Sequence, residues 1–130
     1  MSHLAELAKL LGPGASLISD PDITITYSRD QAPFAESAPP FAVLLARSAQ
    51  EISIALAYAN QNSIPVVTRG AGSGLAGGAN SSAGSLVISL EKMAQILEID
   101  EANQIARVQA GVINLDLDKA AQEFGLAYLP

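Results

Sequence analysis

A glycine-rich segment, RGAGSGLAGGAN at residues 69–80, is the feature that most constrains how this chain folds. Five of its twelve residues are glycine, and each glycine inside a helix costs about 1 kcal/mol relative to alanine. The segment, called the glycine segment below, directly follows the apolar run Pro-Val-Val-Thr at residues 65–68. The pattern predicts a strand that ends where a loop of bare backbone begins.

Short apolar runs at residues 41–46, 65–68 and 86–90 predict strands. Between the first two runs, Ser48 and Glu51 have the spacing of a capping box, which predicts a helix. A strand-helix-strand unit joins parallel strands, and two further short runs predict a hairpin. We therefore predict an α+β fold, with a small mixed sheet that has a parallel βαβ start and a hairpin, flanked by helices. One domain is expected over residues 1–130.

Other elements are predicted from local patterns. Leucines at helical spacing predict an N-terminal helix up to Leu11, residues 23–27 are assigned to a short strand, and Asn114 is assigned as the cap of a last helix. The helix after Ser48 is expected to end at Asn62. The residues expected on the inward faces of the two later helices are Ile52, Ala55, Leu56 and Ala59, and then Leu117, Ala120, Ala121 and Phe124.

Composition excludes several classes of function. The net charge is −6, and the seven basic residues form no cluster that would follow a nucleic acid. There is no cysteine and only one histidine, His3, which is expected to be solvated, so no metal site is predicted. The sequence has no apolar stretch long enough for a membrane span and no signal pattern, and we predict a cytoplasmic protein.

Three interpretations of the glycine segment compete. Residues 72–77 spell G-x-G-x-x-G, with Glu91 farther on, as in a dinucleotide-binding fingerprint. That fingerprint must open a helix, which the following glycines disfavour, and a Walker-type loop would need a lysine that is missing here. A flexible surface loop is the third interpretation. The position after a strand and the cation Arg69 favour a site where backbone N–H groups bind an anion such as a diphosphate.

Residues 65–79 resemble the diphosphate-binding segment of the FAD-linked oxidases of the vanillyl-alcohol oxidase / p-cresol methylhydroxylase (PCMH) superfamily. The glycolate oxidase flavin subunit and D-lactate dehydrogenase branch is nearest. Similar stretches at residues 27–30, 40–51, 93–100 and 108–112 follow in the family's order. The resemblance implies the first subdomain of a PCMH-type FAD-binding domain, as an N-terminal part of a larger enzyme whose second FAD subdomain and substrate domain would lie beyond Pro130.

The resemblance also implies the site and the activity. The contacts carried over to the FAD diphosphate are Arg69, Gly70, Ala71, Gly72, Ser73, Gly74, Leu75, Gly77, Gly78 and Ala79. The segment has no histidine to tether flavin, so FAD is expected to be held non-covalently. The whole enzyme would oxidise a small D-2-hydroxy acid, and no residue of this chain is assigned as catalytic.

Two other kinds of function stay open from the residues alone. One alternative is a non-catalytic module: either a nucleotide-binding module without turnover, or an interaction module that binds no nucleotide and self-associates through the surface that meets the missing subdomain. A Rossmann-like NAD-binding domain is the second alternative.

Overall fold

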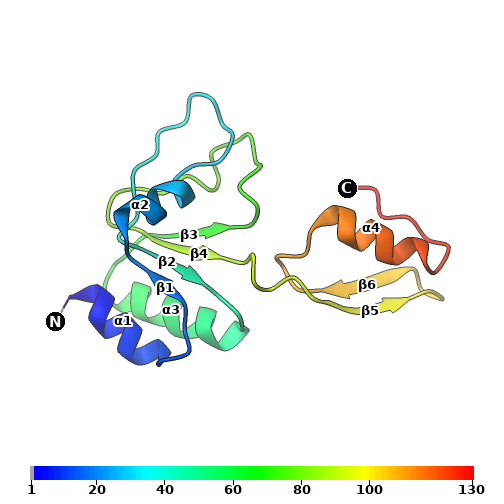
Figure 1. Ribbon diagram of the computed structural model, residues 1–130, viewed down its shortest axis with the longest axis horizontal. Helices are drawn as coiled ribbons and strands as arrows, with labels where there is room; N and C mark the ends of the chain where they lie inside the picture. The colour runs from blue at the N-terminus through cyan, green and yellow to red at the C-terminus, as the bar shows by residue number, and fades with distance from the viewer. Residues whose placement is uncertain (1) are drawn as a thin grey trace. The chain divides into compact units, whose positions relative to one another are not determined.

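The computed structural model describes residues 2–130, which form two compact units that divide after Lys92 (Figure 1). The prediction of one domain over the whole chain stays a prediction. In chain order the elements are α1 (His3–Leu11), β1 (Leu17–Ile18), α2 (Pro21–Thr24), the 3₁₀ helix η1 (Ile25–Tyr27), β2 (Ala42–Leu45), α3 (Ala49–Gln61), β3 (Val66–Arg69), β4 (Leu86–Ser89), β5 (Ile96–Asp100), β6 (Ile105–Val108) and α4 (Asn114–Gln122).

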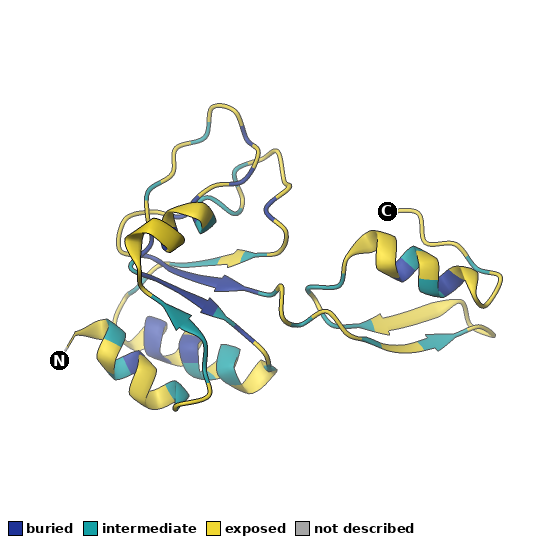
Figure 2. Ribbon diagram, in the orientation of Figure 1, coloured by how far each residue is buried: buried dark blue, intermediate teal, exposed yellow. Residues whose placement is uncertain are grey.

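The first unit is built on a four-stranded sheet with the order β1-β2-β4-β3. Strands β2 and β3 both run parallel to β4, whereas β1 pairs antiparallel with β2. The two central strands carry the core, because Val43, Leu44, Leu86 and Ile88 are almost fully buried (Figure 2). Continuous apolar runs are typical of strands that are covered on both faces. The predicted mixed sheet with its parallel start is therefore confirmed.

Helices α1 and α3 cover one face of this sheet (Figure 1). Ser48 caps α3 as predicted: its Oγ accepts a hydrogen bond from the Glu51 N–H at 3.2 Å. The Glu51 carboxylate accepts from the N–H of Arg47 rather than of Ser48, at 2.7 Å, so the box closes one residue earlier than expected. The last helical residue is Gln61 and Asn62 is the C-cap, so the helix stops where it was predicted to stop.

The inward face of α3 differs in part from the prediction. Ala55 and Ala59 are buried, but Leu56 is 46% exposed and Tyr58 takes its place. The Tyr58 hydroxyl donates to a Glu6 carboxylate oxygen at 2.8 Å, and it lies 2.7 Å from His3 Nδ1. This helix-to-helix contact with α1 turns Tyr58 inward, and it gives His3 a partner that the sequence did not indicate.

The opposite face of the sheet carries α2, η1 and two long loops (Figure 1). The strand predicted at residues 23–27 is wrong, because these residues are helical in α2 and η1. Asp20 caps α2 by accepting from the Asp22 N–H at 2.9 Å, and Pro21 occupies the first helical position, where proline is well tolerated. The antiparallel edge strand is formed earlier, by β1.

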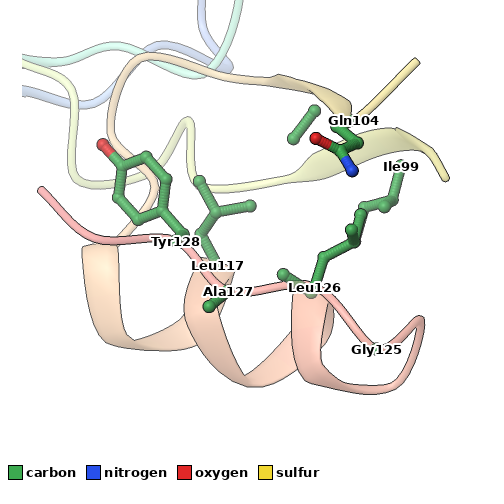
Figure 3. A pocket seen from close by; sticks show the side chains of 9 residues that line it. Ile99, Gln104, Leu117, Gly125, Leu126, Ala127 and Tyr128 are labelled. Carbon is green, nitrogen blue, oxygen red and sulfur yellow. The ribbon is translucent and has the colours of Figure 1, made fainter. Parts of the chain in front are cut away.

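The second unit contains the predicted hairpin, β5 and β6, as a two-stranded sheet of its own rather than as part of the first sheet. Helix α4 follows, with Leu117 and Ala121 buried as expected. Asn114 is its first helical residue and not its cap, and Phe124 lies beyond the helix, 43% exposed. A cavity of about 400 Å³ lies in this unit, lined by residues that include Ile99, Leu117 and Tyr128 (Figure 3).

Among the helices of residues 2–130, none has both the length and the apolar character needed to cross a membrane.

Candidate functional site

The glycine segment leaves the carboxyl end of β3, whose last residue, Arg69, pairs with Ser89 of β4. Strand β3 is half-exposed rather than buried, because it is the edge strand of the sheet and has β4 as its one partner. Residues 70–85 contain no helix. A dinucleotide-binding fingerprint lies at the start of a helix, and no helix begins here. Residues 72–77 therefore do not form such a fingerprint.

Two glycines of the segment have backbone conformations that only glycine adopts readily. Gly72 has a φ of +70° and Gly77 a φ of +78°, both in the left-handed region that a Cβ disfavours. A Cβ on Gly72 would collide with the guanidinium of Arg69, and one on Gly77 would lie 2.9 Å from the Cβ of Ala35. Glycine at both positions is needed for the turn, and at Gly77 it is also needed for the space, because the guanidinium near Gly72 is the movable end of a side chain whereas the Ala35 Cβ is fixed.

Arg69 lies over Gly72 and is held by neutral groups. Its Nη1 donates to the carbonyl oxygen of Arg29 at 2.8 Å, and its guanidinium carbon lies 5.8 Å from the centre of the Tyr27 ring. Such a cation–π contact is weakly stabilising. The positive charge of Arg69 thus stays at the start of the glycine segment rather than in a surface ion pair.

Tyr27 links this arginine to the end of β4. Its hydroxyl donates to Glu91 Oε2 at 3.4 Å, and the Ser89 hydroxyl donates to the same oxygen at 3.3 Å. Burial raises the pKa of Tyr27, and the nearby Glu91 charge raises it further, against the opposite effect of Arg69. Tyr27 therefore stays a neutral hydroxyl donor at physiological pH.

A second loop, residues 28–38, packs along the glycine segment and is called the brace loop below. Its Asp30 is 5% exposed. Asp30 Oδ1 accepts from the Ala32 N–H at 2.9 Å, and Oδ2 accepts from the Ala79 N–H at 3.4 Å. The Ala32 amide is the main cause that lowers the pKa of Asp30, burial opposes it, and the amides of Ala79 and Gly77 and the Arg69 charge lower it further.

Asn80 and Ser81 complete the connection between the two loops. Asn80 Oδ1 accepts from the Asp30 N–H at 2.7 Å, and its Nδ2 donates to the carbonyl of Glu36 at 3.0 Å. Ser81 donates its N–H to the carbonyl of Ser28 at 2.8 Å and its hydroxyl to that of Ala38 at 2.6 Å. Sequence reasoning missed these residues. Aspartate and asparagine commonly bond to loop backbone, but nothing local indicates which distant loop they meet.

The first half of the glycine segment keeps its backbone N–H groups free. Within the described chain, none of the N–H groups of residues 70–76 donates a hydrogen bond, and of these seven residues only Gly72 is buried. Arg69, the residue before them, also lines an open polar depression of about 520 Å³ together with Arg29 and Asp30, and none of residues 70–76 is part of that lining. Free amides next to a guanidinium fit a phosphate-containing ligand.

The ten residues predicted to contact FAD are consecutive apart from Ala76: Arg69 ends β3, and the other nine lie in the loop that follows it. Their backbone N–H groups are not all free to bind a ligand. The N–H of Ala79 is engaged by Asp30, whereas those of residues 70–75 are free. The role of each in FAD binding stays a prediction.

Comparisons with known proteins identify the family of the chain. The sequence profile described as FAD binding domain matches residues 40–130. The chain is similar to glycolate oxidase subunit GlcD of Bacillus subtilis, with 43% identity over 106 residues that cover 82% of this chain and 22% of that protein. It is 35% identical to D-lactate dehydrogenase of Anaerostipes hadrus over 128 residues, which cover 98% of this chain and 27% of that one.

The fold is likewise shared with solved structures. Substrate-bound p-cresol methylhydroxylase matches with a TM-score of 0.77 and 24% identity, over 95% of this chain and 24% of that chain. The chain therefore spans about a quarter of the length of these relatives. The predicted fold, the first part of a PCMH-type FAD-binding domain, is confirmed.

The matched residues make up most of the chain and include the whole glycine segment. This chain belongs to the FAD binding domain family, and its curated relatives include glycolate oxidase and D-lactate dehydrogenase.

Proposed function

We propose that this chain holds the diphosphate of FAD in a flavin-dependent oxidoreductase, and that the whole enzyme oxidises a small D-2-hydroxy acid of the glycolate or D-lactate type. The observation that carries the proposal is the row of free N–H groups at residues 70–76, next to Arg69 and beyond a parallel strand. The names of the relatives support the substrate class. The cytoplasmic location predicted from the sequence stays a prediction.

The residues fit the phosphate groups in a simple way. The N–H groups of Gly70 to Leu75 would donate to phosphate oxygens, and Arg69 would offset the negative charge of the phosphates. Glycines have no side chain, so the ligand can approach the backbone closely. Gly77, Gly78 and Ala79 would extend the surface that contacts the phosphates. When bound, FAD supplies the redox chemistry, and the protein supplies position and electrostatics.

The proposed binding is non-covalent. The glycine segment offers no histidine, and the one histidine of the chain, His3, lies on α1 against Tyr58. Residues that meet the hydroxy acid are expected in the part of the enzyme that corresponds to the remaining length of the relatives.

Gly70→Val tests the proposal without straining the fold. Gly70 has no positive φ, and a Cβ there meets nothing within 4 Å. If the ligand lies against this backbone, the variant should weaken FAD binding about tenfold or more, which corresponds to about 1.4 kcal/mol. Titration of the protein with FAD, followed by isothermal calorimetry, measures the affinity.

Gly14→Val is the matched control, because Gly14 is equally open and lies far from the segment in the sequence. It should bind FAD like the wild type. ADP should compete with FAD, since it carries the same diphosphate, whereas NAD binding without FAD binding would favour the Rossmann alternative. Equal FAD affinity of Gly70→Val and Gly14→Val, or no binding by the wild type, would contradict the proposal.

A further inference from the structure

Asp30 is the one buried charged side chain among residues 2–130, and neither the family resemblance nor the proposed function gives it a role. An ionised carboxylate is costly to bury unless hydrogen-bond donors surround it. The groups that donate hydrogen bonds to this carboxylate are therefore the groups that it holds in place.

The donors come from both loops. Within the brace loop, the Ala32 N–H bonds to Oδ1, which closes a local turn. Across the loops, the Ala79 N–H bonds to Oδ2 at 3.4 Å, and the same oxygen lies 3.5 Å from where a Cβ of Gly74 would be. Asp30 thus contacts the glycine segment near its middle and near its end.

Neighbouring bonds fix the same part of the chain. The Gln31 N–H donates to the carbonyl of Gly74 at 2.9 Å, and the Asp30 N–H donates to Asn80 Oδ1 at 2.7 Å. The backbone from Gly74 to Asn80 is therefore tied to the brace loop at both ends. The N–H groups of residues 70–76, by contrast, donate no hydrogen bond within residues 2–130.

We propose that Asp30 is a positioning residue for the diphosphate site: its carboxylate anchors the Ala79 end of the glycine segment, so that the N–H groups of residues 70–76 stay turned toward the ligand. The ligand part of this inference rests on the proposed function, whereas the anchoring contact does not. Asp30 touches no reacting atom and acts through the segment.

Electrostatic repulsion predicts the opposite effect of Asp30 on FAD binding. The direction in which FAD affinity changes when the carboxylate charge is removed therefore tests the proposal. A carboxylate near a diphosphate repels it, although Arg29 and Arg69 line the same depression and offset that effect. Removal of the charge should tighten FAD binding if repulsion dominates. It should weaken binding if the carboxylate is needed to hold the segment.

The test compares Asp30→Asn with Asp20→Asn in the full chain. Asparagine has the shape of aspartate, and it can still accept from Ala32, but its amide group then presents a donor to the Ala79 N–H. Asp20 is the matched control, because it also accepts an N–H two residues on, from Asp22 at 2.9 Å, and it is exposed. Amide hydrogen exchange by NMR reports the anchoring, and FAD titration reports the ligand.

We expect Asp30→Asn to speed exchange of the Ala79 amide about tenfold or more and to weaken FAD binding about tenfold or more. The β4 amides should exchange as before, which separates positioning from a general loss of stability. Asp20→Asn should leave Ala79 exchange and FAD affinity unchanged. Loss of Ala79 protection in Asp30→Asn would support the anchoring even if the wild type bound no FAD, a result that would reject the proposed function alone.

Two outcomes would overturn the inference. One is an Ala79 amide that exchanges in the wild type as fast as a free peptide, a measurement that needs no variant to fold. The other is an Asp30→Asn protein that binds FAD as tightly as the wild type or more tightly.

Discussion

At the scale of single residues, the glycines of one segment serve different purposes. Gly72 and Gly77 are required by the chain's own geometry, since both have positive φ, and at Gly77 a Cβ would also lie too close to the Ala35 Cβ. Gly70 and Gly78 have neither constraint, because a Cβ at either position meets nothing within 4 Å. The folded chain alone does not require glycine there, which agrees with a ligand that needs the space.

Asp30 leads to a prediction about pH. Its pKa is lowered by the Ala32 amide first, and its ionised form is also favoured by the facing positive charge of Arg69, while Arg29 lines the same depression. Because the folded pKa lies below the unfolded value of about 3.9, the stabilising effect of Asp30 is present above that value. It should be lost as the pH falls through the folded pKa.

Chemical unfolding from about pH 6 to about pH 2.5, which includes the ordinary aspartate pKa of about 3.9, measures this effect. Asp30→Asn should lose less stability on acidification than the wild type, and the carboxyl carbon of Asp30 should titrate below the ordinary range in NMR spectra. A carboxyl that titrates at or above the ordinary value would contradict the prediction.

At the scale of elements, the residues at the starts of helices explain which secondary-structure predictions were right and which were wrong. The Ser48 cap and the Glu51 side chain define the start of α3 from sequence spacing alone. The pair Asp20 and Pro21 carries an equally local signal, a cap followed by proline at the first helical position. Residues 23–27 predict a strand by composition, but the helix start signal at Asp20 and Pro21 is the one that the structure follows.

Ser48→Ala should destabilise the first unit by about 1 kcal/mol, because one N–H at the start of α3 loses its acceptor. Urea unfolding followed by circular dichroism measures this loss. Ser53→Ala, in the exposed middle of the same helix, serves as the control and should be neutral or slightly stabilising, since alanine favours helix. Equal effects of the two substitutions would show that the cap contributes nothing.

At the scale of the whole molecule, the two units differ in how much core they have. The first contains the buried strands β2 and β4 and the helices packed on them. In the second, residues 93–130, the buried side chains are Leu117 and Ala121. A piece of that size buries too little apolar surface to be very stable by itself.

We therefore expect amides of the β5–β6 hairpin to exchange with solvent faster than those of β4, because local opening costs less where few apolar contacts are lost. Hydrogen exchange followed by mass spectrometry compares the two peptides in one experiment. Equal protection of hairpin and β4 would indicate that the second unit opens only together with the first.

The sequence by itself determined the elements whose signals are local: the buried strands from continuous apolar runs, α3 from its cap, and the glycine segment as a loop without helix. The roles of the ten FAD-contact residues came from a family resemblance, and they stay predictions. Only the tertiary structure decided that β3 is an edge strand, that the hairpin forms its own sheet, and that Asp30 bonds to Ala79, 49 residues away. Periodicity and capping act over a few residues, whereas a contact between two loops depends on the path of the whole chain between them.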